Sequence, residues 1–354
     1  MKKLFLSLPL LASLFVFNAC TTDVELYADY KDIPVIYGLL NATEDTNFVR
    51  INRAFSGNND NPINANEVAL IADSCNYPGK LRAYIVEYKQ GYGNSYEPTG
   101  DTLMLDTLTI HDKEEGVFYS PSQKVYYTTD KHKFTNNNSH SKYLYKLFVH
   151  KGNDTVTAKT GLVGGDNFKI TTSSLNFKST YSNNSGKIKF NPADNAVFYN
   201  LEFVFTYHES HNGGPVVDKQ VSYSCGTKSI EDLTPETGQY FFTYGENVLF
   251  NLLKEAIGSD TVVNPMHPNV ERWFDNTIDK KPILIKLSAG ADELYNYIQV
   301  NSQSGFLQTV PDYTNVTGGY GVFSSRINLT KEVAISPGTQ LDLYKKESWG
   351  FVQH

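Results

Sequence analysis

Alternation between apolar and polar residues is the feature that most limits how this chain can fold. From position 143 to 149 every second residue is aromatic or aliphatic: Tyr143, Tyr145, Leu147 and Val149. A Lys-Gly-Asn-Asp sequence at 151–154 supplies turn residues, and a run containing Thr and Val returns to Leu162. Because successive side chains of a strand point to opposite faces, this pattern predicts a β-hairpin with one buried face.

The same kind of pattern recurs along most of the chain. Tyr and Phe, which favour strands, number 24 and 21. Further strands are expected at 34–41, 48–55, 81–88, 186–192, 196–207, 283–287 and 294–300, with one more between 333 and 344. The sequence therefore predicts a mostly-β fold.

A glycine-containing segment at 161–166 divides these strands into two sets. The second set begins with a strand that ends at Pro192, followed by a short turn and a longer strand with alternating apolar residues. This arrangement resembles the B–C corner of fibronectin type III domains, with Phe190 where that family has Trp. We therefore expect two β-sandwich domains of the immunoglobulin or fibronectin III type, at 34–163 and 164–354.

One segment breaks the β pattern. Residues 246–257 place aliphatic side chains at helical spacing, among them Val248, Leu249 and Leu252, and Gly258 follows as a stop. The spacing predicts an amphipathic helix of about three turns. We expect it to pack against the second domain, and a helix that binds a partner is the alternative.

The N-terminus has the pattern of an export signal. Two lysines precede an apolar stretch at 4–17, which is shorter than the about 20 residues needed to span a bilayer. Ala before Cys20 resembles the bacterial lipobox, although Phe17 stands where Leu is usual. The resemblance implies a signal peptide at 1–19 and a lipidated tether at 20–33. An ordinary signal peptide that happens to end near a cysteine is the alternative.

Lipid on Cys20 would hold an otherwise soluble chain at a membrane, because several acyl chains together anchor a protein stably. Asp23 and Glu25 follow closely and resemble a surface-export signal of Bacteroidota lipoproteins, while a plain acidic tether is the alternative. We therefore expect an outer-membrane protein on the cell surface.

The charge of the chain limits its partners. Cleavage of the signal peptide removes two lysines and no acid, so the formal net charge falls from −7 to −9. Recognition of nucleic acid needs basic patches, and the longest basic clusters here are pairs of lysines. The composition therefore argues against a nucleic-acid partner.

Two cysteines remain once Cys20 carries lipid. Cys75 and Cys225 would then lie in an oxidising compartment, where disulfides persist. A bridge between them would tie the two halves of the protein together and stabilise the fold by a few kcal/mol. Two separate buried thiols are the alternative, because the sequence does not give the distance between them.

The densest cluster of reactive residue types is His208, Glu209 and His211. A zinc-protease helix needs its histidines four residues apart, and here the spacing is three, with two glycines close behind. We interpret the cluster as a turn between strands with polar tips, and a metal site in a loop is the alternative. No phosphate-binding glycine loop or Gly-x-Ser-x-Gly elbow occurs. We predict no catalytic residues, no metal and no cofactor.

Asp-Thr-aliphatic tripeptides occur four times and resemble the O-glycosylation sequence of exported Bacteroidota proteins. The threonines that would be modified are Thr102, Thr107, Thr155 and Thr261. Ordinary strand and turn composition explains the tripeptides equally well.

The segment at 305–326 contains a Pro, then Thr-Asn, then a glycine-rich turn that leads into Gly-Val-Phe. It resembles the terminal signature of a family of Bacteroidota outer-membrane lipoproteins of uncharacterised function (DUF4249-like). Members are often encoded beside TonB-dependent transporters. The resemblance implies an accessory lipoprotein that captures ligand for such a barrel or caps it. Because no catalytic constellation occurs, we expect no enzymatic activity. A surface adhesin or structural subunit is the alternative, and a hydrolase is a third. The ligand is not readable from the sequence.

Gly318, Gly319 and Gly321 have a physical role within this signature. Glycine permits positive φ and close approach of another backbone segment. We expect a structural turn that brings Val322 and Phe323 into a core strand, with a binding loop on a rigid β scaffold as the alternative.

Overall fold

The computed structural model describes residues 32–54, 69–111, 113–116, 119–130, 140–180, 183–258, 270–302 and 313–353. The expected signal peptide, lipidated Cys20 and glycosylation site Thr261 lie outside these residues.

Strands dominate the described chain, so the mostly-β prediction is confirmed. The strands are β1 (Pro34–Leu40), β2 (Asn47–Arg53), β3 (Arg82–Gln90), β4 (Tyr96–Met104), β5 (Asp106–Ile110), β6 (Gln123–Thr128), β7 (Tyr143–Lys151), β8 (Asp154–Gly161), β9 (Lys169–Ile170), β10 (Ser174–Leu175), β11 (Ser185–Asn191), β12 (Phe198–His211), β13 (Val217–Ser229), β14 (Tyr240–Gly245), β15 (Val270–Trp273), β16 (Ile283–Gly290) and β17 (Tyr320–Ile335). The α-helices are α3 (Ala72–Cys75), α5 (Val248–Ile257), α6 (Asp292–Ser302) and α7 (Pro337–Tyr344), with 3-10 turns η2 (Tyr92–Asn94) and η3 (Glu347–Trp349).

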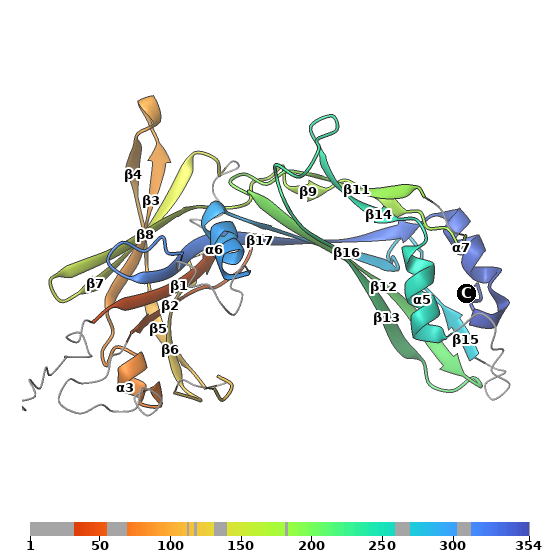
Figure 1. The fold of residues 1–354 in the computed structure, drawn as a ribbon, viewed down its shortest axis with the longest axis horizontal. Coiled ribbons are helices and arrows are strands. Elements are labelled where there is room, and N and C mark those ends of the chain that lie inside the picture. Colours follow the sequence, from red (N-terminus) through yellow and green to blue (C-terminus); the bar gives the residue numbers. More distant parts are fainter. Residues whose placement is uncertain are drawn as a thin grey trace, which may run out of the picture.

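The strands form two lobes. In each lobe two sheets pack against each other around one hydrophobic core. The largest sheet has the order β13-β12-β16-β17-β1-β2-β6-β5 and extends through both lobes. In the N-terminal lobe it packs against the sheet β4-β3-β7-β8, and in the C-terminal lobe against β14-β11-β9. Figure 1 shows the lobes end to end, with the β3–β4 hairpin projecting from the first and α5 and α7 on the second.

Strand β17 joins the two lobes. Residues 320–325 pair in parallel with residues 35–40 of β1, and residues 326–333 pair antiparallel with residues 283–290 of β16. The strand therefore contributes to the N-terminal lobe with its first part and to the C-terminal lobe with its second part, as its course across Figure 1 shows.

The predicted division at 163/164 needs a correction for this reason. Val316 and Phe323, which the division assigned to the second domain, are buried in the core of the N-terminal lobe. We therefore define the N-terminal lobe as β1–β8 with residues 316–325, and the C-terminal lobe as residues 164–302 with 326–353. A pairing between the two ends of a chain leaves no local pattern from which to predict it.

The predicted helix at 246–257 is confirmed as α5. Leu249, Phe250 and Leu253 are buried in the core of the C-terminal lobe. Packing against this lobe is therefore what the structure shows, and Gly258 ends the helix with a φ of 109°.

The predicted strand at 294–300 is wrong, because these residues lie in helix α6. Their apolar residues alternate, which suggested a strand, but Leu294, Tyr297 and Ile298 also fit a helical period. Asp292 and Glu293 in the first turn favour the helix, since negative charge is stabilising at a helix N-terminus.

The strand expected between 333 and 344 is also wrong for most of its length. Strand β17 ends at Ile335 and α7 follows at once. Ser336 caps this helix by accepting a hydrogen bond from the Thr339 amide at 3.2 Å, and Pro337 occupies the first helical turn. Ser followed by Pro favours the start of a helix. This preference outweighs the tendency of the surrounding aliphatic residues to form a strand.

Candidate functional site

The two cysteines are separate, free thiols, so the bridge between Cys75 and Cys225 is not formed and the alternative holds. Cys75 is buried at the end of α3 in the N-terminal lobe, and its Sγ donates to the Ala69 carbonyl at 3.4 Å. Cys225 lies on β13 and packs against the core of the other lobe. Burial raises the pKa of the Cys225 thiol to about 12.

The glycine-rich signature forms a structural turn, as expected. Gly318 and Gly321 have φ values of 84° and 109°. A Cβ at Gly319 would lie 2.5 Å from the Pro34 carbonyl oxygen, and one at Gly321 would overlap the Ile36 carbonyl. Strand β1 can therefore approach β17 this closely only because both positions lack a side chain.

Asn315 in the same signature holds the start of β17 in place. Its Oδ1 accepts from the Phe323 amide at 2.9 Å, and its Nδ2 donates to the Phe323 carbonyl at 2.7 Å. Its Nδ2 also donates to the Lys159 carbonyl on β8 at 3.1 Å. These contacts join the two sheets of the N-terminal lobe, so this part of the signature serves the fold.

The histidine-rich cluster lies at the end of β12, and the turn itself is formed by the residues after His211. His208 contacts Asp218 at 2.7 Å and Asp275 at 3.3 Å. Histidine and acids are thus engaged in pairs across strands. Within the described residues no group of three or more His, Cys, Asp and Glu side chains is arranged to hold a metal.

Glu209 in this cluster is paired on both sides. Its carboxylate accepts from His211 Nε2 at 3.0 Å and from Arg272 Nε on β15 at 2.8 Å. Burial alone would raise the pKa of Glu209, but the hydrogen bond from His211 and the Arg272 charge outweigh it and hold the pKa below its usual range. Glu209 is therefore held by one contact within β12 and one ion pair across to β15.

Three of the four candidate glycosylation threonines lie in strands of the N-terminal lobe. Thr102 on β4 and Thr107 on β5 are half-buried, whereas Thr155 at the start of β8 is exposed. Thr155 Oγ1 lies 3.0 Å from His150 Nδ1. Thr155 is the most accessible of the three hydroxyls.

A hollow in the N-terminal lobe was not predicted from the sequence. It encloses about 400 Å³ in the N-terminal lobe, between β1, β2, α3 and the segment before β6. Ligand sites in proteins occupy about 300–1,000 Å³. The residues that line it are Val35, Tyr37, Arg50, Asn52, Arg53, Ala54, Cys75, Asn76, Lys113, Tyr119, Ser122 and Gln123. We call this hollow the cationic pocket.

Three of these lining residues carry positive charge: Arg50, Arg53 and Lys113. Among the described residues that line the pocket, none is Asp or Glu. This concentration of positive charge contrasts with the chain as a whole, whose net charge is −7. The contrast gives the pocket a local preference for anions.

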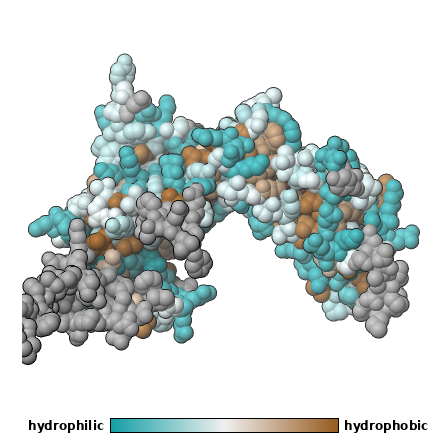
Figure 2. Space-filling view, viewed as in Figure 1, coloured by the Kyte–Doolittle hydropathy of each residue, from teal (hydrophilic) through white to brown (hydrophobic). Residues whose placement is uncertain are grey.

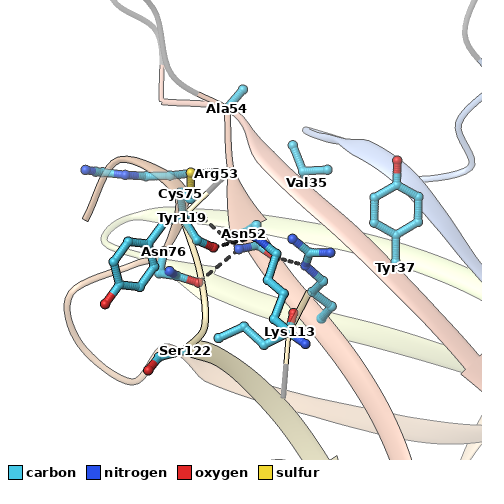
Figure 3. Close-up of a pocket in the computed structure, with 12 residues that line it drawn as sticks. Val35, Tyr37, Asn52, Arg53, Ala54, Cys75, Asn76, Lys113, Tyr119 and Ser122 are labelled. Atoms are coloured by element: carbon cyan, nitrogen blue, oxygen red, sulfur yellow. Dashed lines mark hydrogen bonds between the residues drawn. The ribbon is translucent and has the colours of Figure 1, made fainter. Parts of the chain in front are cut away.

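Asn52 is the centre of the hydrogen-bond network in the pocket. Its Nδ2 donates to the Cys75 carbonyl at 2.8 Å and to Asn76 Oδ1 at 3.0 Å, and its Oδ1 accepts from Arg50 Nε. Figure 3 shows Asn52 between Tyr37 on one side and Asn76 with Tyr119 on the other. The network fixes the side chain of Arg50 without using the end of its guanidinium.

Arg53 is held in place by two contacts. Its Nη2 donates to the Asp73 carbonyl, and its guanidinium lies 6.0 Å from the centre of the Tyr77 ring. Its Nε is buried and has no hydrogen-bond partner among the described residues. Because this nitrogen is buried, it does not face the open hollow.

Aromatic rings and amides complete the wall. Tyr37 on β1 is paired directly with Arg50 on β2, and its ring lies 6.1 Å from that of Tyr297 on α6. Tyr119 accepts a hydrogen bond at its carbonyl from Lys113 Nζ. Cationic donors beside apolar rings suit a ligand that has an anionic group and an apolar body.

Comparison with models of protein families and with curated proteins finds no match for this chain. Within the part of the chain that the structure describes, no helix is both long and apolar enough to cross a membrane.

Proposed function

We propose that the protein is an accessory lipoprotein of the outer membrane, anchored by lipid on Cys20 at the cell surface, that captures a ligand beside a TonB-dependent barrel. The observation that carries the proposal is the cationic pocket, a formed hollow of about 400 Å³ with several charged donors in its wall. The family-like signature supports it as a resemblance, since lipoproteins of that kind occur beside such transporters.

The position of the pocket relative to the expected anchor also supports the proposal. Cys20 lies twelve residues before Asp32, the first described residue. An extended chain of this length spans at most roughly 40 Å. Val35 in the pocket wall is only three residues further on, so the pocket would stay close to the membrane surface, where a barrel would accept ligand.

Native purification tests the proposal. The tagged full chain, produced at its native level, is cross-linked in cells and purified from outer membranes, and the attached proteins are identified by mass spectrometry. We expect a TonB-dependent barrel in near-stoichiometric amount. The variant Cys20→Ala, which cannot be lipidated, should leave the membrane fraction and lose the barrel. Recovery of the lipidated protein with no barrel would contradict the proposal.

A surface adhesin is the second candidate, because the outer face of the N-terminal lobe exposes large apolar side chains. Tyr37, Phe48 and Leu108 are 39%, 45% and 46% exposed, and Figure 2 shows hydrophobic surface on the flanks of both lobes. Binding of the protein to matrix or cells that lack the transporter would favour this function.

A further inference from the structure

We infer that the cationic pocket binds a small organic anion, with its carboxylate- or sulfonate-type group on Arg50 and its apolar body against Tyr37. The inference rests on the proposed function, since it names the class of ligand that would be captured. Three features of the pocket support it: its charge, the orientation of Arg50 and the composition of the wall.

Among the described residues, no carboxylate neutralises Arg50 or Arg53. Neither Arg50 nor Arg53 forms an ion pair with a carboxylate in the described chain; Arg50 contacts an amide oxygen and Arg53 a backbone carbonyl. Carbonyl and amide oxygens carry only partial charge. Two full positive charges therefore remain beside a half-enclosed hollow, where an anion would be attracted more strongly than in open solvent.

Arg50 is oriented before any ligand arrives. Asn52 accepts from its Nε, and Asn52 is itself fixed by its bonds to the Cys75 carbonyl and Asn76. No described residue binds the two terminal nitrogens of the guanidinium, and their planar fork matches the two oxygens of a carboxylate. Fixing the side chain in advance lowers the entropy lost on binding.

Arg53 adds positive charge near the pocket without contacting the ligand. Its Nη2 donates to the Asp73 carbonyl, and its guanidinium lies 6.0 Å from the centre of the Tyr77 ring. Its Nε is buried, and because Arg53 stands three residues after Arg50 on β2, the two side chains leave opposite faces of the strand.

The side chains of the pocket wall determine which body the ligand can carry besides its anionic group. The side chains of Val35 and Tyr37 lie on the face of β1 that lines the pocket. Tyr37 is paired with Arg50 on the neighbouring strand β2. An apolar or aromatic body attached to the anionic group would therefore lie against these side chains while its charge reaches Arg50. Inorganic phosphate has no such body and would use only part of the site.

Two fluorescent probes distinguish the contribution of the anionic group to binding from that of the aromatic rings. Anilinonaphthalene sulfonate has an aromatic body and one anionic group, and N-phenyl-naphthylamine has the same rings without the sulfonate. Both are titrated into the full mature chain carrying Cys20→Ala, which keeps every described residue. We expect one sulfonate probe per protein, at least tenfold tighter binding than for the neutral probe, and weaker binding at high salt.

The matched variants are Arg50→Gln, Arg53→Gln and Arg82→Gln. Arg82 is an exposed arginine on β3, in the other sheet of the same lobe, and lies outside the pocket. Loss of a charged hydrogen bond should weaken binding of the sulfonate probe about tenfold for Arg50→Gln. Arg53→Gln removes only a nearby charge and should weaken binding less. Arg82→Gln should bind like the wild type, and Arg50→Lys should fall between.

Equal binding by Arg50→Gln and Arg82→Gln, or equal affinity for the two probes, would overturn the inference. Circular dichroism of each variant shows whether it is folded. If Arg53→Gln does not fold, binding of the sulfonate probe by Arg50→Lys still tests the inference. If the probe experiment fails while a barrel still co-purifies with the native protein, the ligand class is wrong and the accessory function stands.

Discussion

Single residues of the glycine-rich signature decide whether β1 and β17 can pair. Gly321 has a φ of 109°, a backbone conformation that other residues rarely adopt, and its Cα faces the Ile36 carbonyl at a distance that leaves no room for a side chain. Gly319 meets the Pro34 carbonyl in the same way. The pairing that joins the two ends of the chain therefore depends on two positions without a Cβ.

Gly321→Ala should destabilise the protein by about 2–4 kcal/mol, because it adds both backbone strain and a clash with a neighbouring strand. Urea unfolding followed by circular dichroism measures the change. Gly79→Ala is the matched control, since a Cβ there meets no atom within 4 Å. It should change the free energy of unfolding by less than about 1 kcal/mol. Equal effects of the two substitutions would show that the close approach is not needed.

The residues of the cationic pocket show why sequence reasoning missed it. Arg50 and Arg53 stand three apart on a strand that the alternating pattern predicted correctly. Lys113 and Tyr119 lie some sixty residues later in an irregular segment. Only the packing of α3 and this segment beside β2 brings the side chains together, and no spacing in the sequence encodes that packing.

Elements were predictable where a local period was unambiguous. The hairpin of β7 and β8 and the helix α5 follow from their spacing alone. Helix α6 was missed because its apolar residues fit both a strand and a helix, and because its stability comes from contacts distant in sequence. Its Leu294 amide, for example, donates to Ser324 Oγ on β17 at 3.1 Å.

Glu293 is the main polar anchor of α6. Its Oε2 accepts from Thr160 Oγ1 on β8 at 2.8 Å and from Ser324 Oγ on β17 at 3.1 Å. Burial raises the pKa of Glu293, and the hydrogen bonds from the two hydroxyls only partly oppose this. The folded protein therefore binds this proton more tightly than the unfolded chain does.

The pH dependence follows from that difference. As pH rises from the ordinary glutamate pKa of about 4.3 through the raised pKa of the folded state, Glu293 loses stabilisation, and at neutral pH its buried charge costs free energy. Glu293→Gln, which still accepts both hydroxyl bonds, should raise the free energy of unfolding at pH 7.5 by about 1 kcal/mol. The gain should disappear at pH 4.

Urea unfolding at both pH values measures this effect. Glu255→Gln removes an exposed carboxylate from another helix, α5, and controls for the general loss of one negative charge. A gain in stability that is the same at pH 4 and pH 7.5 would contradict the role assigned to the buried charge of Glu293.

At the scale of the whole molecule, β17 connects the two lobes because it pairs with strands of both. Its first part completes the sheet behind the cationic pocket, and its second part lies between β16 and the short β10 of the other lobe. Because both parts belong to one continuous strand, we expect loss of order in one part to loosen the pairing of the other. We therefore expect the lobes to unfold together, although each has its own core.

Each lobe carries its own natural reporter of unfolding. Cys75 reports on the N-terminal lobe and Cys225 on the C-terminal lobe, and both are free thiols. The two tryptophans of the chain, Trp273 and Trp349, both lie in the C-terminal lobe. Pulsed alkylation across a urea series, read by mass spectrometry at each cysteine, therefore follows the lobes separately, with tryptophan fluorescence as a second reading of the C-terminal lobe.

The most direct test of the shared strand is this alkylation series on the wild type and on Gly321→Ala. Cys75 and Cys225 should become reactive at the same urea concentration, where the tryptophan fluorescence also changes. Gly321→Ala, located in the part of β17 that pairs with β1, should lower both midpoints by the same amount. A lower midpoint for Cys75 with an unchanged midpoint for Cys225 would contradict the claim, because it would show two lobes that unfold independently.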